Sequence, residues 1–366
     1  MPAPARSARS IKGSTACTDS RSAAVPSGEL RDPGAARPAR APYDGAVAEQ
    51  VRVAVVGVGN NVSALVQGIA LYRATGDLPG VRHPVIDGLG VGDIGFTAAF
   101  AMSPEKTGRD LSEAVFLPPN NFPRLMADLP ASGVTVSRGL DGDGPGEVER
   151  VAADLAGAEV VLYAAPSGRP QTARAYARAA LEAGAAFVNT TADPVARDPQ
   201  LLGAYEAAGL PLLGDDLASQ FGTSVVHRAL LELLAERGLT LTGSYQVNLG
   251  GTEDFRNLTE HGGTKHRSKL NALAAGGPAA GPVAVAPLGY LPHLGSRKVA
   301  HVSVEALAWA GTPVSVDVKL TVHDPAGAAG VNVDLVRMAA AALRQGRGGF
   351  LPAAAPLLKS PPGSAA

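Results

Sequence analysis

Residues 51–72 read VRVAVVGVGNNVSALVQGIALY, and this stretch decides the fold. The β-branched run Val51–Val56 predicts a buried strand, and Ser63–Tyr72 carries apolar side chains at helical spacing. Between them, Gly57 permits a tight turn and Gly59 permits a phosphate to approach the backbone closely. Strand, glycine turn and helix in this order are typical of a Rossmann fold, which presents backbone N–H groups and a helix N-terminus to a dinucleotide pyrophosphate.

Composition narrows the class of protein. The chain has 366 residues, 46% of them hydrophobic, which suffices for one large domain or two ordinary ones. A net charge of −1 without a long basic run predicts no nucleic-acid partner, and the single cysteine, Cys17, excludes a disulfide framework and a cysteine-based metal site. No apolar stretch suggests a membrane span. Residues 1–48 are rich in Ala, Pro, Arg, Ser and Gly without an apolar signal region, so we expect a disordered tail and a cytoplasmic protein.

Strands and helices alternate through the first half of the chain. The expected strands after the first are Ile94–Phe100, Glu159–Ala165, Ala186–Asn189 and Pro211–Leu213. The expected helices are Ser103–Val115, Gln171–Gly184 and Ala204–Ala208. This order predicts a parallel sheet with right-handed crossovers. Small and polar residues follow the strands at the edge where open α/β sheets bind ligands: Gly57, Ser167, Thr190, Gly214, Asp215 and Asp216.

The second half changes character. Leu239–Leu249 and His301–His323 alternate as strands do, and Val331–Leu343 returns to a helical pattern. The predicted fold class is therefore α/β: a Rossmann-like parallel sheet domain with a second α+β catalytic and oligomerisation domain inserted before the C-terminal helix. We place the first domain at residues 49–240 and 324–366, and the second at residues 241–323.

Several ordered motifs show that the chain resembles the myo-inositol-1-phosphate synthases, most closely the actinobacterial type. The resemblance covers about residues 51–362. It rests on the glycine turn and on these stretches: TGRDLSEAVF with PNN at 119–121, GDDLASQFGTSVVHR at 214–228, QVNLGGTEDFRNL at 246–258, TKHRSK at 264–269, HDPAGAAG from 323 and LLKSPP from 357.

The resemblance implies an NAD-dependent isomerase that forms a homotetramer. In this family NAD⁺ oxidises C5 of glucose 6-phosphate, a C6 proton leaves, the enolate attacks the C1 aldehyde, and NADH reduces the ketone to give 1D-myo-inositol 3-phosphate. An enolate and a phosphate both need fixed positive charge in a dry site. A tetramer would also cover the apolar residues Val302, Val304 and Ala306, which we expect to be exposed.

Lysines are the first candidates for that charge, because the chain has only seven of them. Lys265 and Lys269 are spaced i and i+4, about 6 Å apart at Cβ on one helix face, where like charges repel unless an anion lies between them. A solvated helix face is the alternative interpretation. The resemblance assigns catalytic roles to both, with Lys269 at the oxyanion. It assigns the same substrate site to these further residues: Lys298, Lys359, Asp216, Asp324 and Asn248.

For the cofactor, the glycine turn and the resemblance predict contacts from the strand ends. These residues are Gly57, Val58, Gly59, Asn60, Asn61, Ser167, Thr190, Gly214, Asp215 and Asp216. Asp215 and Asp216 also fit an ordinary helix N-cap.

Departures from the family pattern leave the substrate open. Ala101 stands where the family has an Asp that binds the adenosine ribose, so weaker NAD binding or a changed cofactor preference follows. Ala218 and His266 replace family lysines, and Leu270 replaces a threonine. Two alternatives therefore stand beside the synthase: a related cyclitol-phosphate synthase acting on another sugar phosphate such as fructose 6-phosphate, and a non-catalytic NAD-binding homologue.

Overall fold

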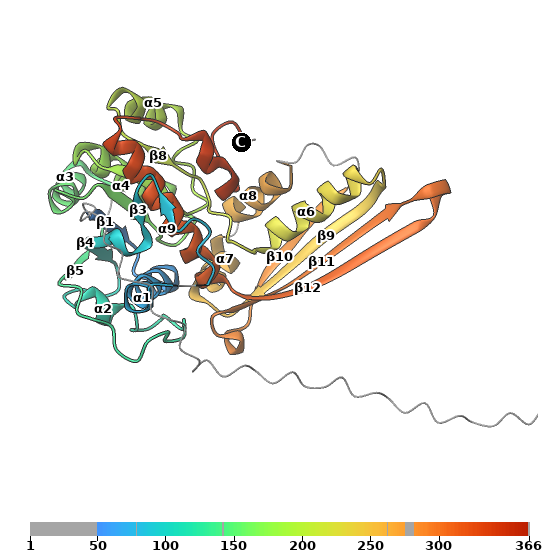
Figure 1. Cartoon of the computed structure of the whole chain (residues 1–366), viewed down its shortest axis with the longest axis horizontal. Coiled ribbons are helices and arrows are strands. Elements are labelled where there is room, and N and C mark those ends of the chain that lie inside the picture. The colour runs from blue at the N-terminus through green and yellow to red at the C-terminus, as the bar shows by residue number, and fades with distance from the viewer. Residues whose placement is uncertain (1–49, 78, 141–142, 262, 275–281, 365–366) are drawn as a thin grey trace, which may run out of the picture. The chain divides into compact units, whose positions relative to one another are not determined.

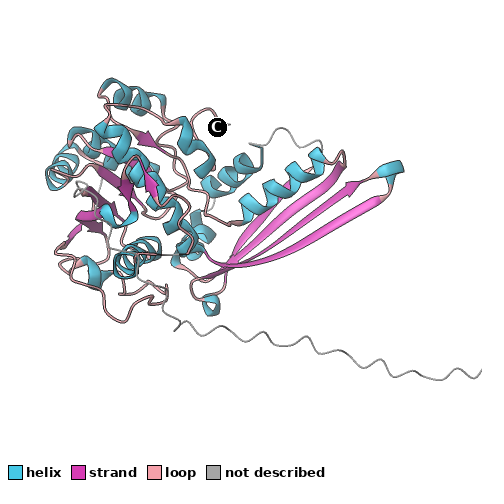
Figure 2. Ribbon diagram, viewed as in Figure 1, coloured by secondary structure: helices cyan, strands magenta, loops and turns pink. Residues whose placement is uncertain are grey.

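A computed structural model of the chain describes residues 50–77, 79–140, 143–261, 263–274 and 282–364. The predicted tail at residues 1–48 and Cys17 lie outside the described residues. The described residues belong to one compact unit that contains two large sheets, drawn in Figures 1 and 2.

The first sheet is parallel and has six strands in the order β5-β4-β1-β6-β7-β8. Its strands are β1 (Val51–Val56), β4 (Ile94–Ala101), β5 (Val136–Arg138), β6 (Val160–Tyr163), β7 (Ala186–Asn189) and β8 (Leu212–Leu213). Numbered along this sheet, the order is 3-2-1-4-5-6, which is that of the Rossmann fold. The sequence-based prediction of a Rossmann-like sheet is therefore confirmed.

Helices cover both faces of this sheet because its strands are apolar on both sides. Side chains such as Val53 and Val55 pack against α1 (Asn60–Thr75) and α9 (Asp324–Arg344). On the opposite face, Ala54 and Val56 belong to a second core with the remaining helices of this layer. These helices are α3 (Pro145–Asp154), α4 (Pro170–Glu182) and α5 (Pro199–Ala207). The C-terminal helix thus returns to the first sheet, as the sequence indicated.

Helix α9 is long and apolar enough to span a membrane by length and composition alone, contrary to our reading of the sequence. Most of it is buried inside the protein, where Leu335, Ala339 and Ala342 pack in the core. Such burial is typical of a core helix.

The predicted helix Ser103–Val115 is wrong. Turns occupy most of this segment, and only a short helix, α2 (Leu111–Ala114), forms. Gly108 has a φ of 82°, which a right-handed helix does not contain, and the Asp110 carboxylate caps α2 by accepting the N–H of Ser112. The residues before α2 instead lead from β4 along the carboxyl edge of the sheet.

The second sheet has four strands in the order β10-β9-β11-β12. They are β9 (Thr240–Gly250), β10 (Val283–Tyr290), β11 (Arg297–Leu307) and β12 (Pro313–His323); a small hairpin elsewhere pairs β2 (Val85–Ile86) with β3 (Leu89–Gly90). Figure 1 shows α6 (Thr223–Glu236) lying along this sheet, with α7 (Glu253–His261) and α8 (Gly263–Ala274) near its end. The sequence placed α6 in the first domain, whereas its packing is against the second sheet. The two-domain division stays a prediction.

This packing corrects the expectation about exposed apolar residues. Val302, Val304 and Ala306 are buried, because they face Leu234 of α6 in a core of their own. On the edge strand β12, apolar side chains are half-exposed at alternate positions from Val314 to Val322.

The two glycines of the turn after β1 have different surroundings. Gly57 has a φ of 93°, and a Cβ there would lie 2.6 Å from the carbonyl oxygen of Ala164. A Cβ on Gly59 would meet nothing within 4 Å. Gly57 therefore permits the close approach of β1 to the β6 turn, while Gly59 faces open space.

We predict that Gly57→Ala lowers the free energy of unfolding by at least about 2 kcal/mol, because a strained backbone angle and a backbone clash add together. Gly59→Ala, the matched control, should lower it by under about 1 kcal/mol. Urea denaturation of both variants measures the difference. Equal stabilities would contradict this account of the turn.

Candidate active site

A cavity of about 630 Å³ opens at the carboxyl edge of the parallel sheet and extends to the second sheet. Its wall includes the glycine turn after β1, the segments that follow β4 and β6, and the N-terminal turn of α6. Residues from α7, α8, β9, β11, α9 and the C-terminal segment complete it. The cavity therefore joins the predicted cofactor edge to the second half of the chain.

Most residues predicted from the sequence meet at this cavity. The predicted cofactor residues that line it are Gly57, Val58, Gly59, Asn60, Asn61, Ser167 and Thr190. The predicted catalytic residues that line it are Lys265, Lys269, Lys298, Lys359, Asp324 and Asn248. Gly214, Asp215 and Asp216 are not among the lining residues.

At the glycine turn, the backbone faces the cavity while the asparagine side chains are engaged elsewhere. Asn60 Oδ1 accepts the N–H groups of Asn121 and Phe122, both at 2.8 Å. Asn61 Oδ1 accepts Nδ2 of Asn332 at 2.7 Å. The first N–H groups of a helix lack partners within the helix, so the start of α1 offers backbone donors and a positive dipole end to an anion.

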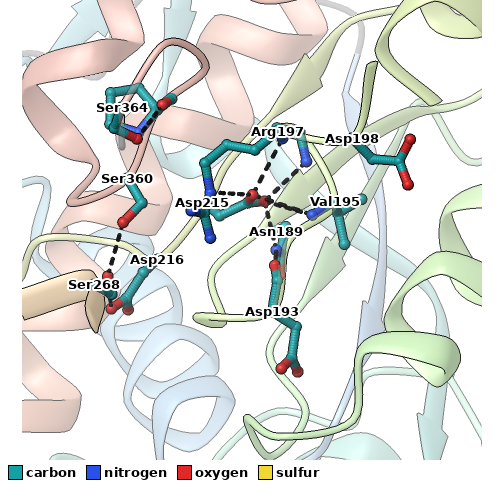
Figure 3. A network of polar contacts seen from close by, with 12 residues as sticks. Asn189, Asp193, Val195, Arg197, Asp198, Asp215, Asp216, Ser268, Ser360 and Ser364 are labelled. Atoms are coloured by element: carbon teal, nitrogen blue, oxygen red, sulfur yellow. Dashed lines mark hydrogen bonds and ion pairs between the residues drawn. The ribbon is translucent and has the colours of Figure 1, made fainter. Parts of the chain in front are cut away.

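Asp215 is buried under the sheet edge and satisfied by protein groups. Its carboxylate accepts Asn189 Nδ2 at 2.8 Å, the Ala196 N–H at 2.9 Å, and Nε of Arg197 at 3.2 Å (Figure 3). Because α6 begins at Thr223 with Gly222 as its N-cap, neither Asp215 nor Asp216 caps that helix. Asp215 thus joins the loop after β7 to the turn after β8, and this geometry does not support its predicted contact with a cofactor.

Asp216 connects two lysines although it does not line the cavity. Its Oδ1 lies 2.9 Å from Nζ of Lys265, on α8, and 3.1 Å from Nζ of Lys359, in the C-terminal segment. Burial opposes its charge, but the two lysines outweigh burial and hold the pKa of Asp216 below its ordinary range. Its φ of 56° is unusual for a residue other than glycine, a kind of strain that clusters at functional sites.

Two serines that the sequence analysis missed complete the surroundings of Asp216. Ser268 Oγ donates to Asp216 Oδ2 at 2.6 Å, and Ser360 Oγ donates to Ser268 Oγ at 3.1 Å; these side chains lie together in Figure 3. Ser268 lies one turn from Lys265, so helical spacing places both on one face of α8. Ser360 becomes a neighbour only through tertiary contact, which the sequence does not show.

Asp324 and Lys298 both line the cavity and form an ion pair. Lys298 Nζ donates to Asp324 Oδ1, and Ser219 Oγ donates to the same oxygen at 3.2 Å. Burial opposes the charge of Asp324, but Lys298 lowers its pKa below the ordinary value. Asp324 is the first residue of α9, where the positive end of the helix dipole also favours a carboxylate.

Lys269 differs from Lys265, Lys298 and Lys359, which line the same cavity. Within the part of the chain that the structure describes, its ammonium has no ion pair or hydrogen bond, and the side chain is 7% exposed. Burial, together with Lys298 and Lys359, lowers the pKa of Lys269 well below its ordinary value. Burial likewise lowers the pKa of Lys359 to about 8, whereas Asp216 overcomes burial and raises the pKa of Lys265. The cavity thus contains a permanently charged lysine beside lysines that can exchange protons.

Asn248 reaches the cavity from β9. Its Oδ1 accepts the Thr223 hydroxyl at 2.8 Å, while its buried Nδ2 has no partner among the described residues. A buried donor without a partner costs about 1–3 kcal/mol, so this amide is suited to a bound oxygen.

At the end of β4, Ala101 lines the cavity where a Rossmann acid would bind a ribose. Lys106 lies nearby, almost fully buried, and donates to the Val58 carbonyl at 2.7 Å and to Asn120 Oδ1 at 2.9 Å. Burial lowers the pKa of Lys106 to about 8. This second cationic group lies next to the glycine turn, and the sequence analysis did not single it out.

Of two further residues that depart from the family pattern, one lies in the cavity and one on the surface. Ala218 lines the cavity, so the missing lysine is lost from the site itself. His266 is exposed on α8 and is not a lining residue, so the structure gives it no role there. No group of three or more His, Cys, Asp or Glu side chains arranged to hold a metal ion occurs among the described residues.

The arrangement defines a class of site: a Rossmann turn that can bind a dinucleotide, facing a cluster of buried lysines that can bind anions. Comparison with known proteins agrees with this class. Residues 222–325 match the family described as myo-inositol-1-phosphate synthase. Inositol-3-phosphate synthase from Mycolicibacterium smegmatis is 38% identical over 342 residues, which are 86% of this chain and 94% of that protein. Its counterpart from Corynebacterium glutamicum is 36% identical over 340 residues, or 85% and 93% of the two chains.

Among solved structures, the crystal structure of Ari2 is 52% identical, with a TM-score of 0.78 over 86% of this chain and 94% of that chain. Given these similarities over nearly their whole lengths, the chain belongs to the myo-inositol-1-phosphate synthase family.

The lowered pKa predicts a distinct pH dependence of labelling at Lys269. Because its pKa is lowered, it loses its proton at a lower pH than an ordinary lysine, and its amine stays reactive to a lower pH. The rate of reductive methylation, followed by mass spectrometry over a series of pH values, should therefore fall less for Lys269 than for the exposed Lys319 of β12 as the pH is lowered. An equal or steeper fall for Lys269 would contradict the electrostatic account of the cluster.

Proposed function

We propose that this chain is an NAD-dependent inositol-3-phosphate synthase that cyclises glucose 6-phosphate to 1D-myo-inositol 3-phosphate. One observation carries the proposal: Lys265, Lys269, Lys298 and Lys359 converge on a single cavity that begins at a dinucleotide-type turn. The 36–38% identity to proteins named inositol-3-phosphate synthase supports the same reaction.

The residues present fit NAD. Gly59 leaves room for a pyrophosphate over the turn, because a Cβ there would meet nothing within 4 Å. The N-terminus of α1 and the backbone of Asn60 and Asn61 would hold that pyrophosphate, with Ser167 and Thr190 at the neighbouring strand ends. Bound NAD supplies the hydride acceptor and then the hydride donor, so the reaction has no net change of oxidation state.

The chain's own residues supply the charge and the proton transfers. Lys265, fixed as a cation by Asp216, gives permanent positive charge for a phosphate or an oxyanion. Lys269 has the lowered pKa of a group that can take up and return a proton, and its place among three other lysines suits an enolate. Lys298 and Lys359 also line the site, and each is paired with a carboxylate. Asn248 offers its free amide N–H to a sugar oxygen.

We further propose that the protein works in the cytoplasm, without a membrane or nucleic-acid partner, and assembles as a homotetramer through the second sheet. The half-exposed apolar positions of the edge strand β12 support the assembly, as does Trp309, which is 91% exposed between β11 and β12. An edge strand with an apolar face favours pairing or packing with another copy.

The function is tested by incubating the purified protein with NAD⁺ and ¹³C-labelled glucose 6-phosphate and reading the product by NMR. We expect inositol 3-phosphate without accumulation of NADH, because the reaction consumes the reducing equivalents it makes. Fructose 6-phosphate is the parallel substrate. A product from fructose 6-phosphate alone would replace this proposal by the related cyclitol-phosphate synthase, and no product from either would favour the non-catalytic homologue.

Two variants separate cofactor from chemistry in the same assay. Gly59→Val should abolish NAD binding in calorimetry while the protein stays folded. Lys269→Met should keep NAD binding but lower turnover about 10²–10⁴-fold, since the group that takes up and returns a proton is lost. Lys319→Met, which removes an exposed lysine, is the matched control and should leave turnover unchanged.

Assembly is tested separately by sedimentation equilibrium. We expect a tetramer at micromolar concentration, and Trp309→Ser should shift the equilibrium toward smaller species because a large apolar side chain is lost from the contact. A monomeric wild-type protein at that concentration would overturn the assembly proposal.

A further inference from the structure

A row of buried polar side chains lies between α6 and β9. Ser244, Gln246 and Asn248 alternate along β9 and are all buried. On α6, Thr223 bonds to Asn248, and one turn later His227 lies against Gln246 and Ser244. Apolar packing would be the ordinary way to join a helix to a sheet, so this polar row needs a separate reason.

Only one end of the row reaches the cavity. Thr223 and Asn248 line it, whereas Ser244, Gln246 and His227 do not. Thr223 is 2% exposed and is the first residue of α6, so its backbone and its rotamer are fixed by the helix start. The hydroxyl therefore has a defined place from which to hold its partner.

In the hydrogen bond between these two residues the hydroxyl is the donor, and this arrangement leaves the amide nitrogen for the ligand. Thr223 Oγ1 donates to Asn248 Oδ1 at 2.8 Å. The oxygen is thereby occupied, and Nδ2, which has no partner among the described residues, is left as the free donor. Rotation of the amide by half a turn would replace this bond by one from Nδ2 to Thr223 Oγ1 and would present the acceptor Oδ1 to the cavity instead.

We propose that Thr223 is a positioning residue that fixes the Asn248 amide so that Nδ2 donates to a hydroxyl, or to the oxyanion formed from it, on the sugar phosphate. This inference rests on the proposed function, because it names the substrate oxygen as the partner of Nδ2. Thr223 acts through Asn248 and does not itself need to touch the substrate.

A double-mutant cycle tests the inference. Thr223→Val keeps the shape and removes the hydroxyl, and it should lower kcat/KM about 10- to 100-fold, as misplacement of a substrate-orienting group does. Thr223→Ser should restore most of the activity. Asn248→Ala should lose more, and Thr223→Val added to Asn248→Ala should lose nothing further. Thr242→Val, at an exposed position of the same strand, is the matched control.

If Thr223→Val lowers kcat/KM as much in the Asn248→Ala protein as in the wild type, Thr223 does not act through Asn248, and the inference is overturned. Retained NAD affinity in calorimetry shows that each variant is folded. Should Thr223→Val fail to fold, the same cycle is run with Thr223→Ala.

A structural readout separates this inference from the proposed function. If the wild type converts no sugar phosphate, the proposed function fails on its own assay. A crystal structure of Thr223→Val then decides the geometry: a rotated or displaced Asn248 amide supports the positioning role, and an amide unmoved from its wild-type place refutes it.

Discussion

The ion pairs of Asp216 are the interaction on which the site depends. One buried carboxylate binds lysines from α8 and from the C-terminal segment, and the backbone of the same residue accepts the N–H of Lys359 at 2.7 Å. The turn after β8 is thereby joined to two segments that are distant in sequence. Removing one partner from a buried charged group costs far more than its net contribution suggests, because the remaining charge stays buried. The carboxylate therefore joins both lysines to the turn after β8, and it raises the pKa of Lys265 against the effect of burial.

Lysines of one chemical type acquire different properties in this cavity. Lys265 lies against Asp216 and is held as a cation, while Lys269, which has no ion pair among the described residues, is driven toward the neutral amine by burial and by its lysine neighbours. The lysine that lies against an aspartate thus keeps its charge, and the lysine that has no aspartate partner can exchange its proton. This separation is what an enolisation needs, because a stabilising cation and a proton acceptor must act on the same substrate.

Local features of the sequence predict much of the fold. They do not predict the contacts of the site that join residues distant in sequence. The strand Val51–Val56 and the positive φ of Gly57 follow from side-chain shape and backbone sterics. The helix expected from Ser103 fails because Gly108 and the cap at Asp110 interrupt it, a signal present in the sequence but given too little weight. The contact of Ser360 with Ser268, by contrast, joins residues 92 positions apart, and no spacing rule reaches that far.

Some of the site residues predicted from the sequence lie at the cavity, and others do not. The lysines and Asp324 were identified through the family resemblance, and the structure brings them to one cavity. Asp215 fits the same motif equally well, yet it is turned into the protein and held by Arg197 and backbone amides. A motif names the residues that a family retains, but it does not distinguish a side chain that contacts ligand from one that shapes the loop beneath it.

The buried lysines make one cavity suited to two anions. Lys269 and Lys106 are both buried without an ion-pair partner among the described residues, one at the second-sheet side and one beside the glycine turn. Burial disfavours the protonated form of each lysine and lowers its pKa, whereas a neighbouring anion favours the protonated form. A dinucleotide pyrophosphate and a sugar phosphate are both anions, so the binding of each should favour protonation of the lysine beside it. Binding of either ligand should then stabilise the folded chain by mass action.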